Sequence, residues 1–430
     1  MERVVYKELV SWKNKTDRKP LVLNGARQVG KTYILREFAR KEYAQVAYFS
    51  LDRHDKVREV FNRMSNPSEI LLALSAISGI DIKPNVTLVV LDEIQDCPAA
   101  LSSLKYFCEE MPELPIAVAG SLLGLSLHSG VSFPVGKVDM LNLYPMNFEE
   151  FMLAMGEDMM VRLLQEKHTS VIDGIGGKYI ELLRQYYYVG GMPAAVKKYV
   201  ETSELKSVRQ IQQTILQNYR RDFSKHAPAH EVPRINMVWD SIPSQLAREN
   251  KKFIYGAVRK GARAADFEIA IEWLIDAGLI YKVNRVNKPE MPLKFYEDRD
   301  AFKLFMLDIG LLGAMVDAPA AAILIGNDIF KEYKGAFTEL YVHNELRQMG
   351  KSIYYYTAPN STIEIDFLVQ KEEQVCPIEV KAEENVKAKS LRTFITNHPS
   401  LQGIRISMKG HCDQQWMLNL PLYDFQSFFE

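Results

Sequence analysis

The first part of the chain alternates short apolar runs with stretches of helical periodicity. The apolar runs have the length of strands and end in polar or glycine residues, as buried strands of a parallel sheet do. They cover residues 20–24, 45–51, 87–91, 116–119 and 140–143. Residues 33–40, after the first run, have the pattern of a helix. For residues 1–150 the pattern therefore predicts an α/β domain with a doubly wound parallel sheet.

Beyond this domain the pattern changes. Residues 151–230 are mainly helical in pattern, with a break at Gly190-Gly191-Met192-Pro193, which is too rich in breakers to lie inside a helix. Residues 301–430 form a separate C-terminal domain with a different pattern.

Residues 231–300 have the pattern of a winged helix. An apolar helical face over 267–275 is followed by a strand over 279–283, a polar turn and a second strand over 293–296. A basic stretch precedes them and contains one acid, Glu249, against Arg248, Lys251, Lys252, Arg259, Lys260 and Arg263. Such a stretch beside a winged helix suggests contacts with the phosphate backbone of DNA, although winged helices also serve as docking modules in ATPases.

A phosphate-binding signature follows the first predicted strand. It has the form G-x-x-x-x-G-K-[ST] and consists of Gly25, Ala26, Arg27, Gln28, Val29, Gly30, Lys31 and Thr32. Glycines at both ends let the backbone wrap around an anion that faces successive N–H groups and a helix N-terminus. We expect Lys31 at the β- and γ-phosphates and the Thr32 hydroxyl at Mg²⁺. The loop predicts ATP and Mg²⁺ as cofactors.

Two further polar positions end core strands of the same sheet. The run over 87–91 ends in Asp92 and Glu93, where Asp92 would hold Mg²⁺ and Glu93 would orient or deprotonate the attacking water. Such a pair favours hydrolysis over binding alone. Ser121 follows the strand over 116–119, where it is either a sensor of the γ-phosphate or an ordinary turn residue.

Composition excludes several classes of protein. At 430 residues, the chain suggests two to three domains, and its 47% hydrophobic and 25% charged residues are typical of globular proteins. A net charge of −1 gives no global attraction to nucleic acid or membrane. The four cysteines lack metal-type spacing and indicate reduced thiols. With no signal-peptide pattern and no apolar stretch long enough for a bilayer, we expect a cytoplasmic protein without a membrane partner.

The last hundred or so residues contain a second cluster of ionisable side chains. Strands over 363–369 and 377–381 flank a polar turn. A hairpin centred between residues 372 and 373 places Asp366 opposite Glu379, and Lys381 shares the face of Glu379. Facing carboxylates destabilise a hairpin unless a cation neutralises them, which suggests Mg²⁺.

Glu339, on a helical stretch, would add a further ligand to that Mg²⁺, and Lys381 would stabilise a developing phosphorane or position a water. The arrangement resembles the D…E-x-K core of restriction-type nucleases of the PD-(D/E)XK class, with Ile365 in place of the proline before the aspartate. The alternative is an ordinary solvated hairpin face, in which Lys381 alone offsets the charge.

The chain as a whole resembles a family of bacterial and archaeal AAA-type ATPases that have a C-terminal domain of uncharacterised function with a nuclease-like core. Matching segments occur in order at residues 18–32, 91–95, 119–121, 144–151, 190–193, 305–311, 364–367 and 378–381. The resemblance implies an ATPase domain, a winged helix and a C-terminal α/β accessory domain with a nuclease-like fold. Modules of this type often act as rings, so the resemblance also implies a homo-oligomer. Members usually carry Gly-Arg where this chain has Gly136-Lys137, and lysine does not replace an arginine finger.

Two functions are consistent with these patterns. The first is a Mg²⁺-dependent ATPase whose nucleotide state drives a conformational switch, coupled to DNA binding or to cleavage by Asp366, Glu379 and Lys381. The second is a slow or non-hydrolysing switch or scaffold, in which the C-terminal hairpin is catalytically inert and the partner is a protein.

Overall fold

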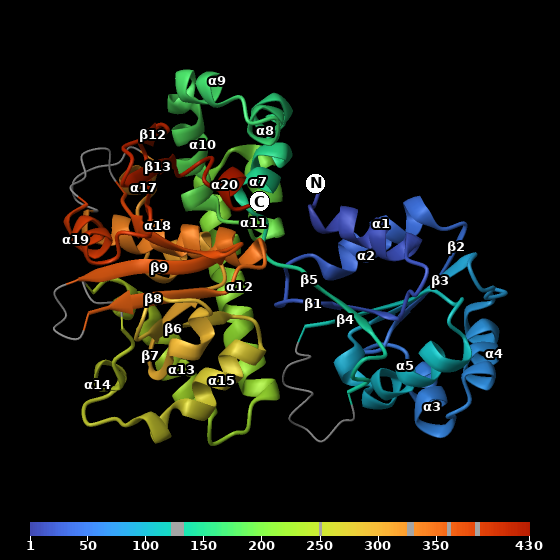
Figure 1. Cartoon of the computed structure of the whole chain (residues 1–430). Helices are drawn as coiled ribbons and strands as arrows, with labels where there is room; N and C mark the ends of the chain where they lie inside the picture. Colours follow the sequence, from blue (N-terminus) through green and yellow to red (C-terminus); the bar gives the residue numbers. More distant parts are fainter. Residues whose placement is uncertain (122–132, 249–251, 325–330, 359–362, 383–387) are drawn as a thin grey trace. The chain divides into compact units, whose positions relative to one another are not determined.

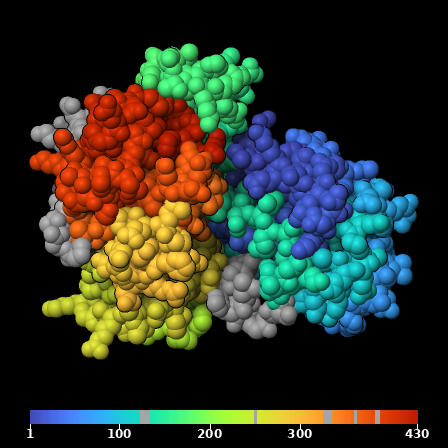
Figure 2. Space-filling model, in the orientation of Figure 1, coloured from blue at the N-terminus to red at the C-terminus, as the bar shows by residue number. Residues whose placement is uncertain are grey.

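The computed structural model of the chain describes residues 1–121, 133–248, 252–324, 331–358, 363–382 and 388–430. Contacts divide the chain into two compact units, and Figure 1 and Figure 2 colour the chain from blue at the N-terminus to red at the C-terminus. The first unit contains residues 1–144 and 276–279, and the second unit contains 145–275 and 280–430. Among the described residues, no helix combines the length and apolar character that crossing a membrane requires.

A five-stranded parallel sheet forms the centre of the first unit, in the order β2-β3-β4-β1-β5. The five predicted strands are all confirmed, with bounds within a residue or two. They are β1 (Leu21–Asn24), β2 (Gln45–Ser50), β3 (Thr87–Asp92), β4 (Ile116–Gly120) and β5 (Asp139–Asn142). Every residue of β3 is buried, as expected for a strand covered on both faces.

Helices cover this sheet and connect its strands. They are α1 (Val5–Asn14), α2 (Lys31–Glu42), α3 (Asp55–Arg63), α4 (Pro67–Ser78) and α5 (Pro98–Glu110), with a short 3₁₀ turn η1 (Ile94–Asp96). A hydrophobic core of the unit packs apolar residues of α3, α4 and α5 against β2, β3 and β4. Because β4 lies between β1 and β3, the ends of these three strands meet at one edge of the sheet.

The second unit begins with helices, as the pattern predicts. They are α7 (Phe148–Ala154), α8 (Asp158–Gln165), α9 (Thr169–Gly174), α10 (Gly176–Val189), α11 (Pro193–Thr202), α12 (Leu205–His226), α13 (Val232–Leu246), α14 (Tyr255–Val258), η2 (Ala264–Asp266) and α15 (Glu268–Asp276). The predicted break lies between α10 and α11. There Asp308 fixes the turn, since it accepts a hydrogen bond from the Gly191 N–H at 2.6 Å.

An eight-stranded mixed sheet follows, in the order β12-β13-β11-β10-β9-β8-β6-β7. The strands are β6 (Ile280–Val286), β7 (Glu297–Met306), β8 (Ile353–Thr357), β9 (Glu364–Lys371), β10 (Gln374–Val380), β11 (Gly403–Ser407), β12 (Cys412–Asp413) and β13 (Met417–Pro421). The accompanying helices are η3 (Leu293–Tyr296), α16 (Ile309–Met315), α17 (Ala320–Leu324), α18 (Lys331–Gln348), α19 (Lys389–Asn397) and α20 (Gln426–Phe429).

The strand predicted over 293–296 is wrong. These residues form the 3₁₀ turn η3, and the partner of β6 is β7, which begins at Glu297. The pair is antiparallel, as expected of a wing, but β6 also pairs in parallel with β8 and thereby joins the C-terminal sheet. The aromatic pattern of 293–296 resembled that of a strand, and Pro292 directly before it directs the chain into a turn.

Candidate functional site

The backbone of residues 25–32 forms a phosphate-binding loop between β1 and α2. Gln28 and Gly30 have positive φ angles of 67° and 101°, which curl the loop. A Cβ atom on Gly25 would lie 2.2 Å from the Leu143 carbonyl oxygen, so only glycine fits there. Among the described residues, no side chain caps the first turn of α2, which begins at Lys31. The N–H groups of that turn are therefore oriented to receive an anion.

The ammonium group of Lys31 lies inside this loop. Its Nζ donates to the carbonyl oxygens of Gly25 at 2.8 Å and Ala26 at 2.7 Å. Burial lowers the pKa of Lys31 to about 8, although the carboxylates of Glu93 and Asp92 oppose that shift. A buried cation beside a ring of N–H donors is a suitable environment for the phosphates of a nucleotide.

Thr32, Asp92 and Tyr48 meet at one carboxylate oxygen. Thr32 Oγ1 donates to Asp92 Oδ2 at 2.7 Å, and Tyr48 Oη donates to the same oxygen at 2.6 Å. Asp92 is buried at the end of β3, and its other oxygen accepts from the Glu93 N–H at 3.0 Å. A hydroxyl and a carboxylate brought together by two different elements are the donors that Mg²⁺ prefers beside a nucleotide, so these residues fit that ion.

Glu93 lies beside Asp92 in a strained backbone conformation. Its φ and ψ angles of 54° and 48° are left-handed, a state that costs of order 1 kcal/mol in a residue other than glycine. Its Oε2 accepts from Gln95 Nε2 at 2.5 Å and from Ser121 Oγ at 3.3 Å. The ends of β3 and β4 are thus linked through one carboxylate, as expected from the position of β4 in the sheet.

Two residues that support this site were not among those predicted from the sequence. Arg3, before α1, donates to the carbonyl oxygens of Val29 at 2.9 Å and Tyr144 at 2.6 Å, which ties the loop to the start of the chain. Tyr48 lies two residues before the end of β2, the strand paired with β3. The strand alternation could have indicated Tyr48, because side chains two residues apart share a face.

Lys137, which stands where members of the resembling family usually have an arginine, and Arg220 both have carboxylate partners. Lys137 Nζ lies 2.7 Å from Glu109 Oε1 within the first unit. Arg220, on α12 of the second unit, pairs with Asp240 of α13. No arginine finger is therefore assigned to either residue.

In the second unit, the hairpin β9–β10 has the predicted register. Gln374 pairs with Lys371, and the ladder continues with the same register to Ile378 opposite Phe367. Beyond this pair, a side-chain contact replaces the ladder. Asp366 Oδ2 accepts a hydrogen bond from the Val380 N–H at 2.8 Å. The pairing of β8 with β9 shifts register beside Asp366, and such irregularities commonly re-aim side chains near functional sites.

Two lysines offset the carboxylates at this end of the hairpin. Lys381 Nζ lies 2.8 Å from Glu379 Oε1. Lys303, on β7, is fully buried and lies 2.7 Å from Glu364 Oε1. Sequence reasoning missed Lys303, because β7 and β9 are separated by more than fifty residues and by two other strands of the sheet.

The charges in this group are coupled. Burial pulls the pKa of Lys303 down, but Glu364, Glu339 and Asp366 outweigh burial and hold the pKa above its usual value. Burial also lowers the pKa of Lys381, but Glu379 and other carboxylates outweigh burial, so this pKa is raised as well. Both lysines are therefore protonated, and Glu339 and Asp366 act on both of them, whereas Glu379 acts on Lys381.

The lysines supply positive charge that the sequence analysis assigned to a metal ion. Among the described residues, no group of three or more His, Cys, Asp or Glu side chains is arranged to hold a metal. Glu339, Asp366 and Glu379 are all described, and they do not form such a group in this structure. The assignment of these residues as metal ligands remains a prediction.

The basic stretch of residues 248–263 is partly described. Lys251 and Glu249 lie outside the described residues. The exposed basic side chains in the described part are those of Arg248, Arg259, Lys260 and Arg263. Arg259 also lies 3.8 Å from Asp266 and over the ring of Phe267, so its charge is partly compensated. The stretch presents cations to solvent, and its contact with DNA remains a prediction.

Comparison with known families divides the chain into three parts. Residues 17–152 match the model of a family described as an AAA domain. Residues 180–322 and 334–423 match two domains of unknown function, DUF8612 and DUF4143. No curated protein matches the chain.

Among solved structures, the chain is similar to the Walker-type ATPase PABY2304 of Pyrococcus abyssi, with 14% identity and a TM-score of 0.46 over 73% of this chain and 95% of that one. It is also similar to the Thermotoga maritima RuvB Holliday junction branch migration motor, with 14% identity and a TM-score of 0.29 over 67% and 90% of the two chains. Drosophila ORC bound to DNA has 15% identity and a TM-score of 0.29 over 73% and 94%. Likenesses this weak carry no information about activity.

The family match and the local geometry agree on the N-terminal unit. Residues 17–152 contain the loop, the acidic pair and Ser121, and they match the model of an AAA domain, which supports nucleotide binding and hydrolysis by this unit.

Proposed function

We propose that this chain is a Mg²⁺-dependent ATPase whose nucleotide state drives a conformational switch. The observation that carries the proposal is the convergence of Thr32 and Asp92, at 2.7 Å, beside the buried ammonium of Lys31. This arrangement supplies a cation for the phosphates and a hydroxyl–carboxylate pair for Mg²⁺. When bound, the ion would neutralise charge on the phosphates.

Each residue of the site has a separate task in this proposal. Lys31 exchanges its contacts with the loop carbonyls for contacts with the β- and γ-phosphates. Thr32 and Asp92 orient the ion, and Tyr48 fixes the Asp92 carboxylate. Glu93 orients the attacking water and accepts its proton, a role supported by its position next to Asp92 in a strained conformation.

The switch is supported by the hydrogen bonds that join the strand ends. Ser121 and Gln95 both donate hydrogen bonds to one oxygen of Glu93. Loss of the γ-phosphate near any of these three residues would therefore change the contacts that join the ends of β3 and β4. We expect this change to reach the second unit through the chain. We also expect a homo-oligomer, as the resemblance implies.

The test of the ATPase is a comparison of the wild-type chain with Lys31→Ala, in which ATP binding and phosphate release are measured with and without Mg²⁺. We expect the variant to lose nucleotide binding or turnover. The matched control is Lys56→Ala, which removes a lysine from the exposed face of α3. Unchanged hydrolysis by Lys31→Ala would refute the assignment.

A second function, cleavage of nucleic acid, is favoured by the hairpin geometry. Asp366 and Glu379 come together at the end of the β9–β10 ladder, and Lys381 lies 2.8 Å from Glu379. A protonated lysine beside carboxylates can stabilise negative charge that develops on a phosphodiester. The rival proposal is an inert scaffold that binds a protein, in which the lysines only neutralise the carboxylates.

Cleavage of plasmid and single-stranded DNA separates these two proposals. The assay compares the wild-type chain with Asp366→Ala, with Mg²⁺ or Mn²⁺ and with or without ATP. Glu373→Ala is the matched control, because Glu373 is an exposed carboxylate at the turn of the same hairpin. Cleavage that only Asp366→Ala abolishes would establish a nuclease. Absence of cleavage would favour the scaffold and leave the ATPase proposal intact.

A further inference from the structure

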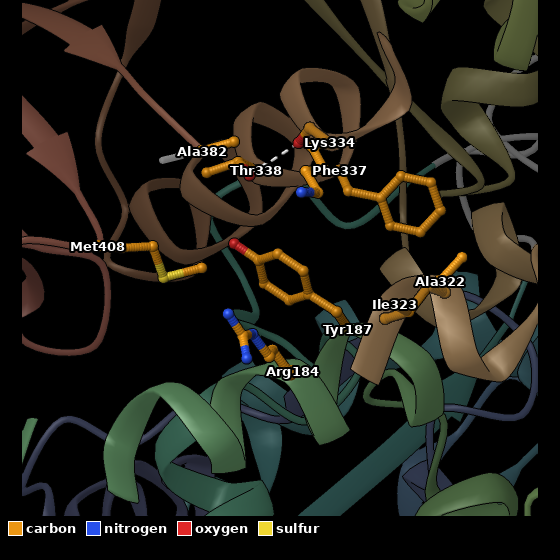
Figure 3. Close-up of a pocket in the computed structure, with 9 residues that line it drawn as sticks. All are labelled: Arg184, Tyr187, Ala322, Ile323, Lys334, Phe337, Thr338, Ala382 and Met408. Atoms are coloured by element: carbon orange, nitrogen blue, oxygen red, sulfur yellow. Dashed lines mark hydrogen bonds between the residues drawn. The ribbon is translucent and has the colours of Figure 1, made fainter. Parts of the chain in front are cut away.

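A pocket with a cavity of about 60 Å³ lies within the second unit (Figure 3). Arg184 and Tyr187 of α10 form one wall, and Lys334, Phe337 and Thr338 of α18 form the opposite wall. Residues of α17 and of the segments after β10 and β11 complete the lining. Figure 3 shows the side chains of Arg184 and Lys334 on two sides of the Tyr187 ring.

The polar part of this pocket is suited to an anion. Its lining contains a guanidinium and an ammonium group, and none of the nine described lining residues is a carboxylate. The side chain of Arg184 is half-buried and has neither an ion pair nor a hydrogen bond among the described residues. Tyr187 Oη is buried without a well-formed hydrogen bond to any of them, and the polar side chains that act on it are those of Thr338 and Glu345. Guanidinium, ammonium and hydroxyl groups donate the hydrogen bonds that a phosphate accepts.

The size of the cavity limits the ligand. A buried water needs about 10–15 Å³ of such volume, so this cavity holds about four to six waters. That volume accommodates a phosphate group but not a whole nucleoside. The other lining side chains are apolar, and two of them, Phe337 and Met408, could pack against a sugar ring. The ligand is therefore a phosphate group attached to a larger molecule.

The pocket adjoins the carboxylate hairpin along the chain. Its lining residue Ala382 directly follows Lys381, and its lining residue Thr338 directly precedes Glu339. A strand of nucleic acid that crosses the hairpin end would present its neighbouring phosphate close to α18.

We propose that this pocket binds a backbone phosphate of a nucleic-acid strand and so positions the strand at Asp366, Glu379 and Lys381. The inference rests on the proposed nucleic-acid role of the second unit. In this view Arg184 and Lys334 are positioning residues, since they act on a phosphate next to the reacting one.

The test is binding of a fluorescein-labelled single-stranded DNA to the full chain, measured by anisotropy between 50 and 200 mM salt. The variants are Arg184→Ala/Lys334→Ala, Tyr187→Phe and the control Arg162→Ala, which removes an exposed arginine of α8. We expect the double variant to bind at least about tenfold more weakly. Its salt slope should fall by about 0.7, the contribution of one phosphate contact on a single strand. Tyr187→Phe should weaken binding without changing the slope.

The outcomes separate the pocket from the function on which it rests. Equal binding by the wild-type chain and both pocket variants, with unchanged melting temperatures, would overturn the pocket and leave nucleic-acid binding in place. No binding by the wild-type chain would overturn both. A third arm uses AMP with the Lys31→Ala chain, where the N-terminal loop is disabled. AMP binding that depends on Arg184 and that DNA does not displace would assign the pocket to a free nucleotide and overturn the strand site.

Discussion

Tyr48 Oη lies 2.6 Å from Asp92 Oδ2, the oxygen that also accepts a hydrogen bond from Thr32. The contact joins β2 to β3, which are paired in parallel so that Ser50 is opposite Asp92. Tyr48 thereby holds the carboxylate in the orientation in which it faces Thr32. Arg36 lies over the Tyr48 ring, 4.2 Å from its centroid, and restricts the ring in turn.

This contact predicts that Tyr48→Phe lowers ATP turnover and the apparent affinity for Mg²⁺ by about tenfold or more, as loss of outer-shell partners of metal ligands usually does. The measurement is the Mg²⁺ dependence of ATP hydrolysis. Tyr33→Phe, at an exposed position on α2, is the control. Identical Mg²⁺ curves for Tyr48→Phe and the wild-type chain would show that Asp92 needs no such support.

Gly25 is predicted to tolerate no side chain. A Cβ atom there would lie 2.2 Å from the Leu143 carbonyl oxygen, so Gly25→Ala must displace the backbone of the loop. We expect a loss of at least about tenfold in ATP affinity, or about 1.4 kcal/mol. Titration with a fluorescent ATP analogue measures it, with Gly174→Ala as a control because a Cβ atom there meets open space. Full affinity in Gly25→Ala would contradict the close packing of the loop.

Lys303 is predicted to be essential for the stability of the second unit. It is fully buried, and its ammonium group offsets Glu364, Glu339 and Asp366. Lys303→Met keeps most of the volume but leaves these carboxylates uncompensated, which should lower the free energy of unfolding by about 3 kcal/mol. Chemical denaturation measures this change, and Lys294→Met, at an exposed position in η3, should have little effect. A stable Lys303→Met would mean that the carboxylates are protonated.

Glu345 is predicted to make stability depend on pH. Burial, together with Glu150, raises the pKa of this carboxyl to about 7, although Phe148 N–H and Gln426 donate to it. A raised carboxyl pKa means that the folded state holds the proton more tightly than the unfolded state. Its contribution to stability is therefore complete below about pH 4.5 and is lost as the pH rises to about 7, at up to about 1.4 kcal/mol per pH unit.

Denaturation at a series of pH values measures this dependence. We expect Glu345→Gln, which is neutral at every pH, to flatten the curve between pH 4.5 and 7, while the exposed Glu181→Gln leaves it unchanged. A curve that Glu345→Gln does not alter would place the titration on another group.

Local pattern was sufficient for much of the fold. The strands and helices of the first unit follow from apolar runs and helical periodicity, and the register of Asp366 and Glu379 follows from counting outward from one turn. Where the pattern was ambiguous, it failed. The aromatic residues at 293–296 are typical of a strand, yet β7 begins only at Glu297.

Contacts between segments that are distant in the sequence could not be predicted from local pattern. Lys303 reaches Glu364 only because β6, β7, β8 and β9 share one sheet, and its order is not encoded in any local pattern. Arg3 likewise supports Val29 through a contact that depends on where α1 packs. The pocket at Arg184 and Lys334 depends on α10 and α18, which are far apart in the sequence.

The most direct test of the proposed ATPase is the rate of ATP hydrolysis by Glu93→Gln, with ATP affinity measured in parallel. Glutamine keeps the size of the side chain and its contacts with Gln95 and Ser121, but it cannot accept a proton from water. We expect affinity close to that of the wild-type chain and turnover lowered by about 10²- to 10⁴-fold. Undiminished turnover in Glu93→Gln would contradict the role of Glu93 as the base and with it the mechanism proposed for this site.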